Sequence, residues 1–90
     1  MRALTKNGKA DLHLHTTYSD GRLSPEEVIA LSARRGLKVV AITDHNTTDG
    51  LVEALAAAQN HPGLQVIPGV ELTTSGDGVH ILGYFVDYTL

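Results

Sequence analysis

The sequence predicts an α/β fold in which three parallel strands are joined by two crossover helices and followed by a fourth strand in a β-hairpin. Three observations support this prediction. Strand-like and helix-like patterns alternate along the 90 residues. Residues 37–43 form a nearly continuous apolar run, which is typical of a strand covered on both faces in a parallel sheet. The segment 73–78 is too short for a crossover helix, so the last two strands should pair antiparallel.

The first predicted strand carries two histidines on one face. Apolar and polar side chains alternate from residue 10 to residue 15, which is the pattern of a two-faced strand. Asp11, His13 and His15 therefore share one face, and two imidazoles placed in this way can reach a common point. The strand then gives way to a polar loop that contains Asp20. Imidazole nitrogens and a carboxylate at one strand end are the ligand set of a Zn, Mn or Fe site.

Three agreeing signals predict the start of the first helix. Ser24 can act as the N-cap, Pro25 suits the first helical position, and Glu27 can close a capping box. Gly36 suits the C-terminal stop. We therefore expect a helix over residues 25–34.

The second helix is expected over residues 49–59, with Thr47 or Thr48 as its cap. The apolar pattern places four side chains on its inward face, namely Leu51, Val52, Leu55 and Ala58. A Pro-Gly pair soon after residue 59 ends the helix, and His61 is expected to be a solvent-exposed turn residue without a functional role.

The last two predicted strands, residues 64–71 and 79–86, carry Glu71 and His80. A turn at the Gly-Asp pair between them places Thr73 opposite His80, so that Glu71 and His80 share a face as diagonal neighbours. A slip of one residue would move His80 to the other face.

Metal-competent side chains stand near an end of each of the four predicted strands. Parallel strands with right-handed crossovers place their carboxyl ends at one edge of a sheet, where functional residues of α/β folds gather. Packing alone is the alternative explanation, but it accounts poorly for four of the five histidines at one edge. We expect six residues to converge there: His13, His15, Asp20, His45, Glu71 and His80.

Composition limits the possible classes of protein. A chain of 90 residues with 42% hydrophobic residues suits one small globular domain. The net charge of −3 argues against a general nucleic-acid-binding surface, which would be basic. There is no cysteine, no signal peptide pattern and no run of membrane-spanning length, so we expect a cytoplasmic protein without a membrane partner.

Four blocks of the sequence resemble the N-terminal part of the PHP family, the polymerase and histidinol phosphatase domain. The blocks are Asp11-Leu12-His13-Leu14-His15 with Ser19-Asp20-Gly21, then Thr43-Asp44-His45, then Pro68-Gly69-Val70-Glu71, and last Val79-His80-Ile81-Leu82-Gly83-Tyr84. They occur in the order found in the family, and the resemblance extends over about residues 10–87 of a single domain that occupies 1–90. The details are most similar to the small stand-alone phosphoesterases, which include phosphatases of nucleoside 3′,5′-bisphosphates and 5′-to-3′ exonucleases of short oligoribonucleotides.

This resemblance implies the N-terminal portion of a distorted (β/α)7 TIM-like barrel with divalent metal ions, Zn, Mn or Fe, up to three in a complete member. By motif, His13 and His15 would bind one metal, and Glu71 would bridge it to a second metal that His80 also binds. Asp20 and His45 would hold a third. Asp11 and Asp44 would lie behind these ligands, with Asp44 orienting an imidazole.

The resemblance also implies the activity. The expected enzyme is a hydrolase, a metal-dependent phosphoesterase that cleaves a phosphate ester of a small molecule or nucleotide, including short oligonucleotides, through a metal-activated water. No separate catalytic side chain is implied. The alternative is a truncated metal-binding module that needs a missing C-terminal part or a partner chain for turnover.

Complete members of the family are longer and supply further ligands from their C-terminal part. A fragment of a longer protein is the simpler interpretation of this chain, and a half-barrel that associates with itself is the alternative. Within these 90 residues, only the position formed by His13, His15 and Glu71 keeps three ligands. We therefore expect one well-bound metal ion there.

Overall fold

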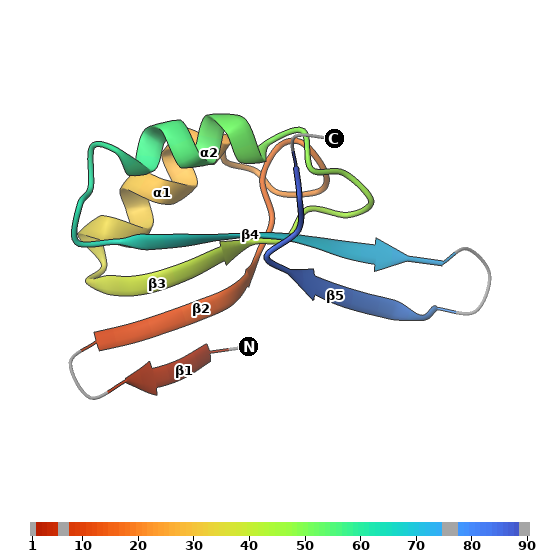
Figure 1. Ribbon diagram of the computed structural model, residues 1–90, viewed down its shortest axis with the longest axis horizontal. Helices are drawn as coiled ribbons and strands as arrows, with labels where there is room; N and C mark the ends of the chain where they lie inside the picture. The colour runs from red at the N-terminus through yellow and green to blue at the C-terminus, as the bar shows by residue number, and fades with distance from the viewer. Residues whose placement is uncertain (1, 6–7, 75–77, 89–90) are drawn as a thin grey trace.

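The computed structural model describes residues 2–5, 8–74 and 78–88. It shows a mixed α/β fold with one curled five-stranded sheet in the order β1-β2-β3-β4-β5. The bounds of the strands are β1 Arg2–Thr5, β2 Gly8–Leu14, β3 Leu37–Ile42, β4 Gln65–Thr73 and β5 His80–Tyr84. The helices α1 Pro25–Arg34 and α2 Leu51–Ala58 lie together over one face of the sheet (Figure 1). Neither helix is long and apolar enough to cross a membrane.

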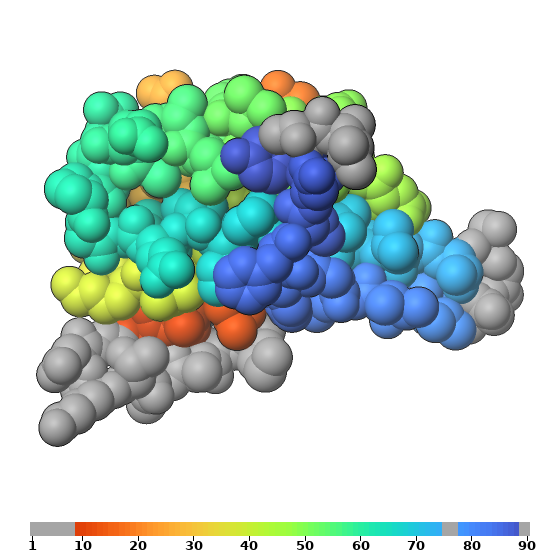
Figure 2. All heavy atoms as spheres, viewed as in Figure 1, coloured from red at the N-terminus to blue at the C-terminus, as the bar shows by residue number. Residues whose placement is uncertain are grey.

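The predicted topology is confirmed. Strands β2, β3 and β4 are parallel neighbours, α1 and α2 form the two crossovers, and β5 pairs antiparallel with β4. The predicted register of the hairpin is also confirmed, because Thr73 pairs with His80 and Glu71 pairs with Leu82. The hairpin projects from the body of the molecule (Figure 2). The turn residues 75–77 lie outside the described residues.

Strand β1 was not predicted from the sequence. It pairs antiparallel with β2, from Arg2 opposite Asp11 to Thr5 opposite Gly8. The Asn-Gly dipeptide at positions 7 and 8 is a recognised hairpin signal that could have indicated a hairpin here, although the observed register places Thr5 opposite Gly8. β1 occupies the edge of β2, which would otherwise be an open edge of the sheet.

The start of α1 is confirmed in detail. The Ser24 side chain accepts a hydrogen bond from the Glu27 backbone N–H, and the Glu27 carboxylate accepts one from the Ser24 backbone N–H. Pro25 occupies the first turn, and Gly36 follows the helix with a positive φ of 78°. This left-handed conformation favours glycine and ends the helix.

Two expectations for α2 are wrong. Its N-cap is Gly50, which has no side-chain cap, while the Thr47 hydroxyl accepts a hydrogen bond from the Asp49 N–H in the preceding turn. A Cβ atom on Gly50 would lie 2.9 Å from Tyr18 Cδ1, so close packing excludes a capping side chain at this position. The expected inward residue Val52 is 64% exposed. Leu51 is buried as predicted, and the other buried residues of the helix are Ala54 and Ala57, whose small side chains allow close approach of the helix to its neighbours.

Proline 68 stands inside β4 without breaking it. It pairs with Ile42 at the last position where β4 contacts β3, and from Gly69 onward β4 pairs with β5. The carbonyl oxygen of Pro68 accepts hydrogen bonds from the N–H groups of Phe85 and Val86. The missing N–H of proline therefore falls where the strand changes partners.

The core lies between the helices and the sheet. Its largest fully buried apolar side chains are Ile29 of α1, Val40 and Ile42 of β3, and Leu51 of α2, each exposed by 1% or less. This core fixes the carboxyl ends of β2, β3 and β4 relative to one another, and the candidate site lies at those ends.

Candidate metal centre

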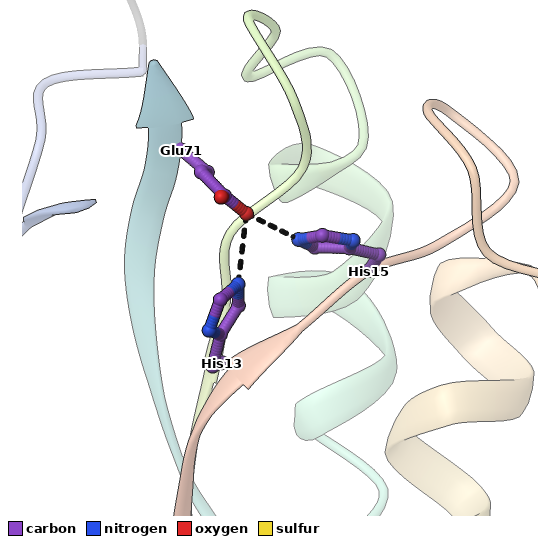
Figure 3. Close-up of side chains that lie close together, drawn as sticks. All are labelled: His13, His15 and Glu71. Carbon is purple, nitrogen blue, oxygen red and sulfur yellow. Dashed lines mark hydrogen bonds and ion pairs between the residues drawn. The ribbon is translucent and has the colours of Figure 1, made fainter. Parts of the chain in front are cut away.

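Glu71 lies at the centre of the candidate site. It comes from β4, and its residue exposure is only 4%. The Nε2 atoms of His13 and His15 both lie 2.8 Å from Glu71 Oε1, as Figure 3 shows. The two histidines stand at the end of β2, on the face that the strand alternation predicts. Two imidazoles and one carboxylate oxygen therefore point at a common position.

A second group forms around Asp20, which lies in the loop after β2. The Nδ1 atom of His15 lies 2.7 Å from Asp20 Oδ1, and the Nε2 atom of His45 lies 3.1 Å from Asp20 Oδ2. His15 therefore presents each of its ring nitrogens to a different carboxylate. This histidine belongs to two ligand groups, whereas sequence reasoning had placed it in one.

A third group joins His45, Glu71 and His80. His80 Nδ1 lies 3.2 Å from Glu71 Oε2, and His45 Nδ1 lies 3.8 Å from Glu71 Oε1. Both carboxylate oxygens of Glu71 thus face imidazoles. This is the geometry expected of a bridging carboxylate.

The structure brings the six predicted residues together at one edge of the sheet. Within each of the three groups, one ligand atom from each residue lies within 4.8 Å of the others: His13, His15 and Glu71; His15, Asp20 and His45; His45, Glu71 and His80. His61 lies in the turn after α2 and belongs to none of these groups. The convergence is a property of the fold, and metal binding by these groups stays a prediction.

The backbone at the end of β3 positions His45. The Glu71 N–H donates to the Asp44 carbonyl oxygen over 3.0 Å, and the Asn46 N–H donates to the Glu71 carbonyl oxygen over 2.9 Å. The parallel pairing thus continues past β3 as a bridge between His45 and Glu71. Asn46 then turns the chain with a positive φ of 53°, a conformation in which asparagine is enriched.

The two carboxylates of the site are held in their ionised form. Burial raises the pKa of Glu71, but hydrogen bonds with His13 and His15 and the charge of His45 outweigh it, so the pKa lies below its usual range. Asp20 shows the same balance, because His15 and His45 lower its pKa more than desolvation raises it. Both groups are therefore anionic near neutral pH, as metal ligands must be.

The donor set fits a divalent metal. Imidazole nitrogens and carboxylate oxygens suit Zn, Mn or Fe, and each group of three leaves coordination positions for water or substrate. His15 can bind through Nε2 while its Nδ1–H donates to Asp20. A carboxylate that accepts a hydrogen bond from a ligating imidazole fixes the tautomer and the orientation of that imidazole.

Asp44 and Asp11 were expected behind the ligands. Asp44 is buried, and it accepts hydrogen bonds from the Thr16 N–H, the Thr16 hydroxyl and the Ser19 hydroxyl. No contact between Asp44 and an imidazole is present in the described chain, so the expected role of orienting a histidine is replaced by contacts with the loop. Asp11 Oδ1 lies 3.3 Å from the His13 backbone N–H, which it contacts from two residues away on the same strand.

Thr73 is a residue of the site to which sequence reasoning gave no role. Its hydroxyl lies 2.9 Å from His45 Nδ1 and 3.1 Å from His80 Nδ1. Its backbone N–H donates to the Asn46 side chain over 2.9 Å. The signal was present in the sequence, because Thr73 shares a strand face with Glu71 and pairs with His80.

The sequence is similar to those of known proteins. A 5′-3′ exoribonuclease from Haemophilus influenzae is 45% identical over 83 residues, which cover 90% of this chain and 30% of that protein. A 3′,5′-nucleoside bisphosphate phosphatase from Chromobacterium violaceum is 46% identical over 79 residues, covering 86% of this chain and 27% of that protein. The chain thus spans about three tenths of the length of these relatives.

Solved structures show the same fold. An amidohydrolase from Chromobacterium violaceum, determined with bound sulfate and no metal, superposes with a TM-score of 0.81 at 43% identity, covering 90% of this chain and 29% of that one. A protein from Bifidobacterium adolescentis described as a metal-dependent phosphoesterase superposes with a TM-score of 0.80 at 35% identity, covering 97% of this chain and 30% of that one. The family model for the PHP domain matches residues 11–84, which include all six residues of the candidate centre, and the chain therefore belongs to the PHP domain family.

Proposed function

We propose that this chain is the metal-binding N-terminal part of a metal-dependent phosphoesterase that hydrolyses phosphate esters of a small molecule or nucleotide. The observation that carries the proposal is the convergence of four histidines and two ionised carboxylates at one sheet edge. The names of the relatives support it, because they include a bisphosphate phosphatase and an exoribonuclease.

The residues present divide into three candidate positions for divalent cations. His13, His15 and Glu71 would hold the first, Glu71 and His80 the second, and Asp20 and His45 the third. When bound, such cations draw in phosphate oxygens and lower the pKa of a coordinated water.

The side chains of the site hold the ligands in place and accept hydrogen bonds from the imidazoles. Glu71 would contribute one carboxylate oxygen to each of two neighbouring positions, because Oε1 faces His13 and Oε2 faces His80. Asp20 accepts a hydrogen bond from the Nδ1–H of His15, so the Nε2 atom of His15 faces the first position. Thr73 contacts the Nδ1 atoms of His45 and His80 and thereby limits their rotation.

We propose a nucleotide, including short oligoribonucleotides, as the substrate class. The support is the activity for which the relatives are named, which is directed at a nucleoside bisphosphate or at RNA. We also propose that further chain is needed to complete the second and third positions, since the relatives are more than three times as long as the matched region. Each of the three groups contains three donor residues, but His15 and His45 each occur in two groups. In the assignment proposed here, the first position therefore has three ligands and the other two positions have two each.

The test is hydrolysis of a nucleoside 3′,5′-bisphosphate in the presence of Mn²⁺, with and without a chelator. It should be run on this chain and on the longest product of its source gene. Phosphate release that requires Mn²⁺ and is lost in Glu71→Gln would support the proposal, because Gln is neutral and cannot bridge two cations. Release that survives both the chelator and Glu71→Gln would contradict it. Metal uptake without turnover in both proteins would instead favour the metal-binding module.

A further inference from the structure

The carboxylate of Asp44 is among the most buried polar groups of the described chain. The residue is 2% exposed. It accepts hydrogen bonds from the Thr16 N–H over 2.6 Å, the Thr16 hydroxyl over 2.7 Å and the Ser19 hydroxyl over 2.7 Å. A buried carboxylate is costly unless donors surround it, and all three of these donors come from the loop after β2. Asp44 therefore holds that loop against the end of β3.

Each member of this arrangement is the sequence neighbour of one residue in the His15, Asp20 and His45 group. Thr16 follows His15, Ser19 precedes Asp20, and Asp44 precedes His45. Adjacent Cα atoms are about 3.8 Å apart, so a displacement of the hydrogen-bonded residues is passed to the ligand beside them. We call Asp44, Thr16 and Ser19 the Asp44 clamp.

The Asp20 group depends on the loop more than the Glu71 group does. His13 and Glu71 belong to paired strands, whereas the side chain of Asp20 is 63% exposed on a loop. Two backbone bonds shape that loop, since the N–H groups of Ser19 and Gly21 both donate to the Thr16 carbonyl oxygen. The clamp then joins the shaped loop to β3, and Ser19 is its contact nearest to Asp20.

We propose that the Asp44 clamp positions Asp20 between His15 and His45, and so controls metal binding at that group selectively. The proposal rests on the proposed function only for the identity of the bound ion. Ser19, Thr16 and Asp44 are positioning residues, because they act through the ligands beside them. Loss of the Ser19 hydroxyl should therefore affect the Asp20 group and spare the position formed by His13, His15 and Glu71.

The test is calorimetric titration of the purified, metal-stripped chain with Mn²⁺. The binding step that Asp20→Ala removes identifies the Asp20 group, and we call it the weaker step. In Ser19→Ala this weaker step should lose about tenfold or more in affinity, which is the loss typical when a supporting hydrogen bond behind a ligand is removed. The tighter step should keep its affinity. Ser19→Thr retains the hydroxyl and should restore the weaker step. Ser24→Ala is the matched control, because it removes a serine hydroxyl that stabilises α1 and contacts no residue of the site.

A second measurement does not depend on metal. NMR relaxation of the backbone amides of residues 17–20 in the metal-free chain should show an ordered loop in the wild type and a more mobile one in Ser19→Ala and Asp44→Asn. Equal loop order in wild type and Ser19→Ala would overturn the clamp. So would an unchanged weaker step in Ser19→Ala, or an equal loss in Ser24→Ala. If the wild type takes up no Mn²⁺, the proposed metal-dependent function fails, and the relaxation data alone then decide for or against the clamp.

Discussion

At the scale of single residues, the loop that carries Asp20 depends on a position where no side chain fits. A Cβ atom on Gly21 would lie 2.5 Å from the carbonyl oxygen of His15 and 2.8 Å from the Thr16 nitrogen. These are backbone atoms that cannot move aside without displacing His15. We expect Gly21→Ala to lower the free energy of unfolding by about 1–3 kcal/mol, the usual cost of overpacking. Urea denaturation measures this change.

Gly63→Ala is the matched control for that substitution. No heavy atom lies within 4 Å of a Cβ placed on Gly63, and its φ is not in the positive range. The free energy of unfolding should therefore change by no more than about 0.5 kcal/mol in this variant. Equal effects of the two substitutions would show that the close approach at Gly21 has no energetic consequence.

The residues of the site were predictable because each one sits near a strand end, and strand ends follow from apolar patterns. The contacts of individual side chains were less predictable. The burial of Ala54 in place of Val52 depends on the rotation of α2 about its axis, which packing against the core decides. The contacts of Asp44 depend on where the loop after β2 folds, and no periodicity in the sequence encodes that position.

At the scale of elements, the capping box at the start of α1 has a measurable energy. The Ser24 side chain accepts a hydrogen bond from the backbone N–H of Glu27, and the Glu27 side chain accepts one from the backbone N–H of Ser24. We expect Ser24→Ala to lower the free energy of unfolding by about 1 kcal/mol, because one helical N–H then loses its acceptor. Ser24→Thr keeps an acceptor and should recover most of that loss. Denaturation followed by far-ultraviolet circular dichroism measures both variants.

The other half of the capping box should respond to pH. The hydrogen bonds from the Ser24 backbone and side chain hold the pKa of Glu27 below its usual range, and slight desolvation opposes them. A lowered pKa in the folded state means that the stabilisation is present above the pKa of the unfolded chain and is lost as pH falls through the lowered value. The stability difference between wild type and Glu27→Gln should therefore shrink below about pH 4. A constant difference from neutral to acid pH would contradict this assignment.

The bounds of helices and strands were predictable where local sequence signals alone determine them. The start of α1 and its end before Gly36 agree with the structure, because capping and a left-handed glycine are local effects. The pairing of β1 with β2 was missed because the apolar pattern of Arg2–Thr5 is too short to predict a strand. Strand β1 is stabilised by its pairing with β2, and the apolar pattern of a single segment does not reveal such a pairing.

At the scale of the whole molecule, the sheet and its crossovers decide which ligands meet. His13 belongs only to the group with His15 and Glu71, and His80 belongs only to the group with His45 and Glu71. The side chain of His80 is 51% exposed on the projecting hairpin, whereas that of His13 is 33% exposed beside the buried Glu71. The ligands at the His13 position should therefore be better ordered in the metal-free chain than those at the His80 position. They then lose less conformational entropy when a metal binds.

We therefore predict that the tightest metal-binding step of this chain is lost in His13→Ala and retained in His80→Ala. Removal of His13 leaves only two ligands at its position, and the loss should exceed the roughly 10–100-fold loss that follows removal of a group supporting a ligand. In the wild type, the affinity of this step should fall as the pH decreases into the acid range, because a protonated imidazole can no longer ligate a metal. Calorimetry of stripped protein with Zn²⁺ at several pH values measures both effects. Equal losses in the two variants would mean that the tight position includes His80. An affinity that does not change with pH would mean that histidines do not hold the metal.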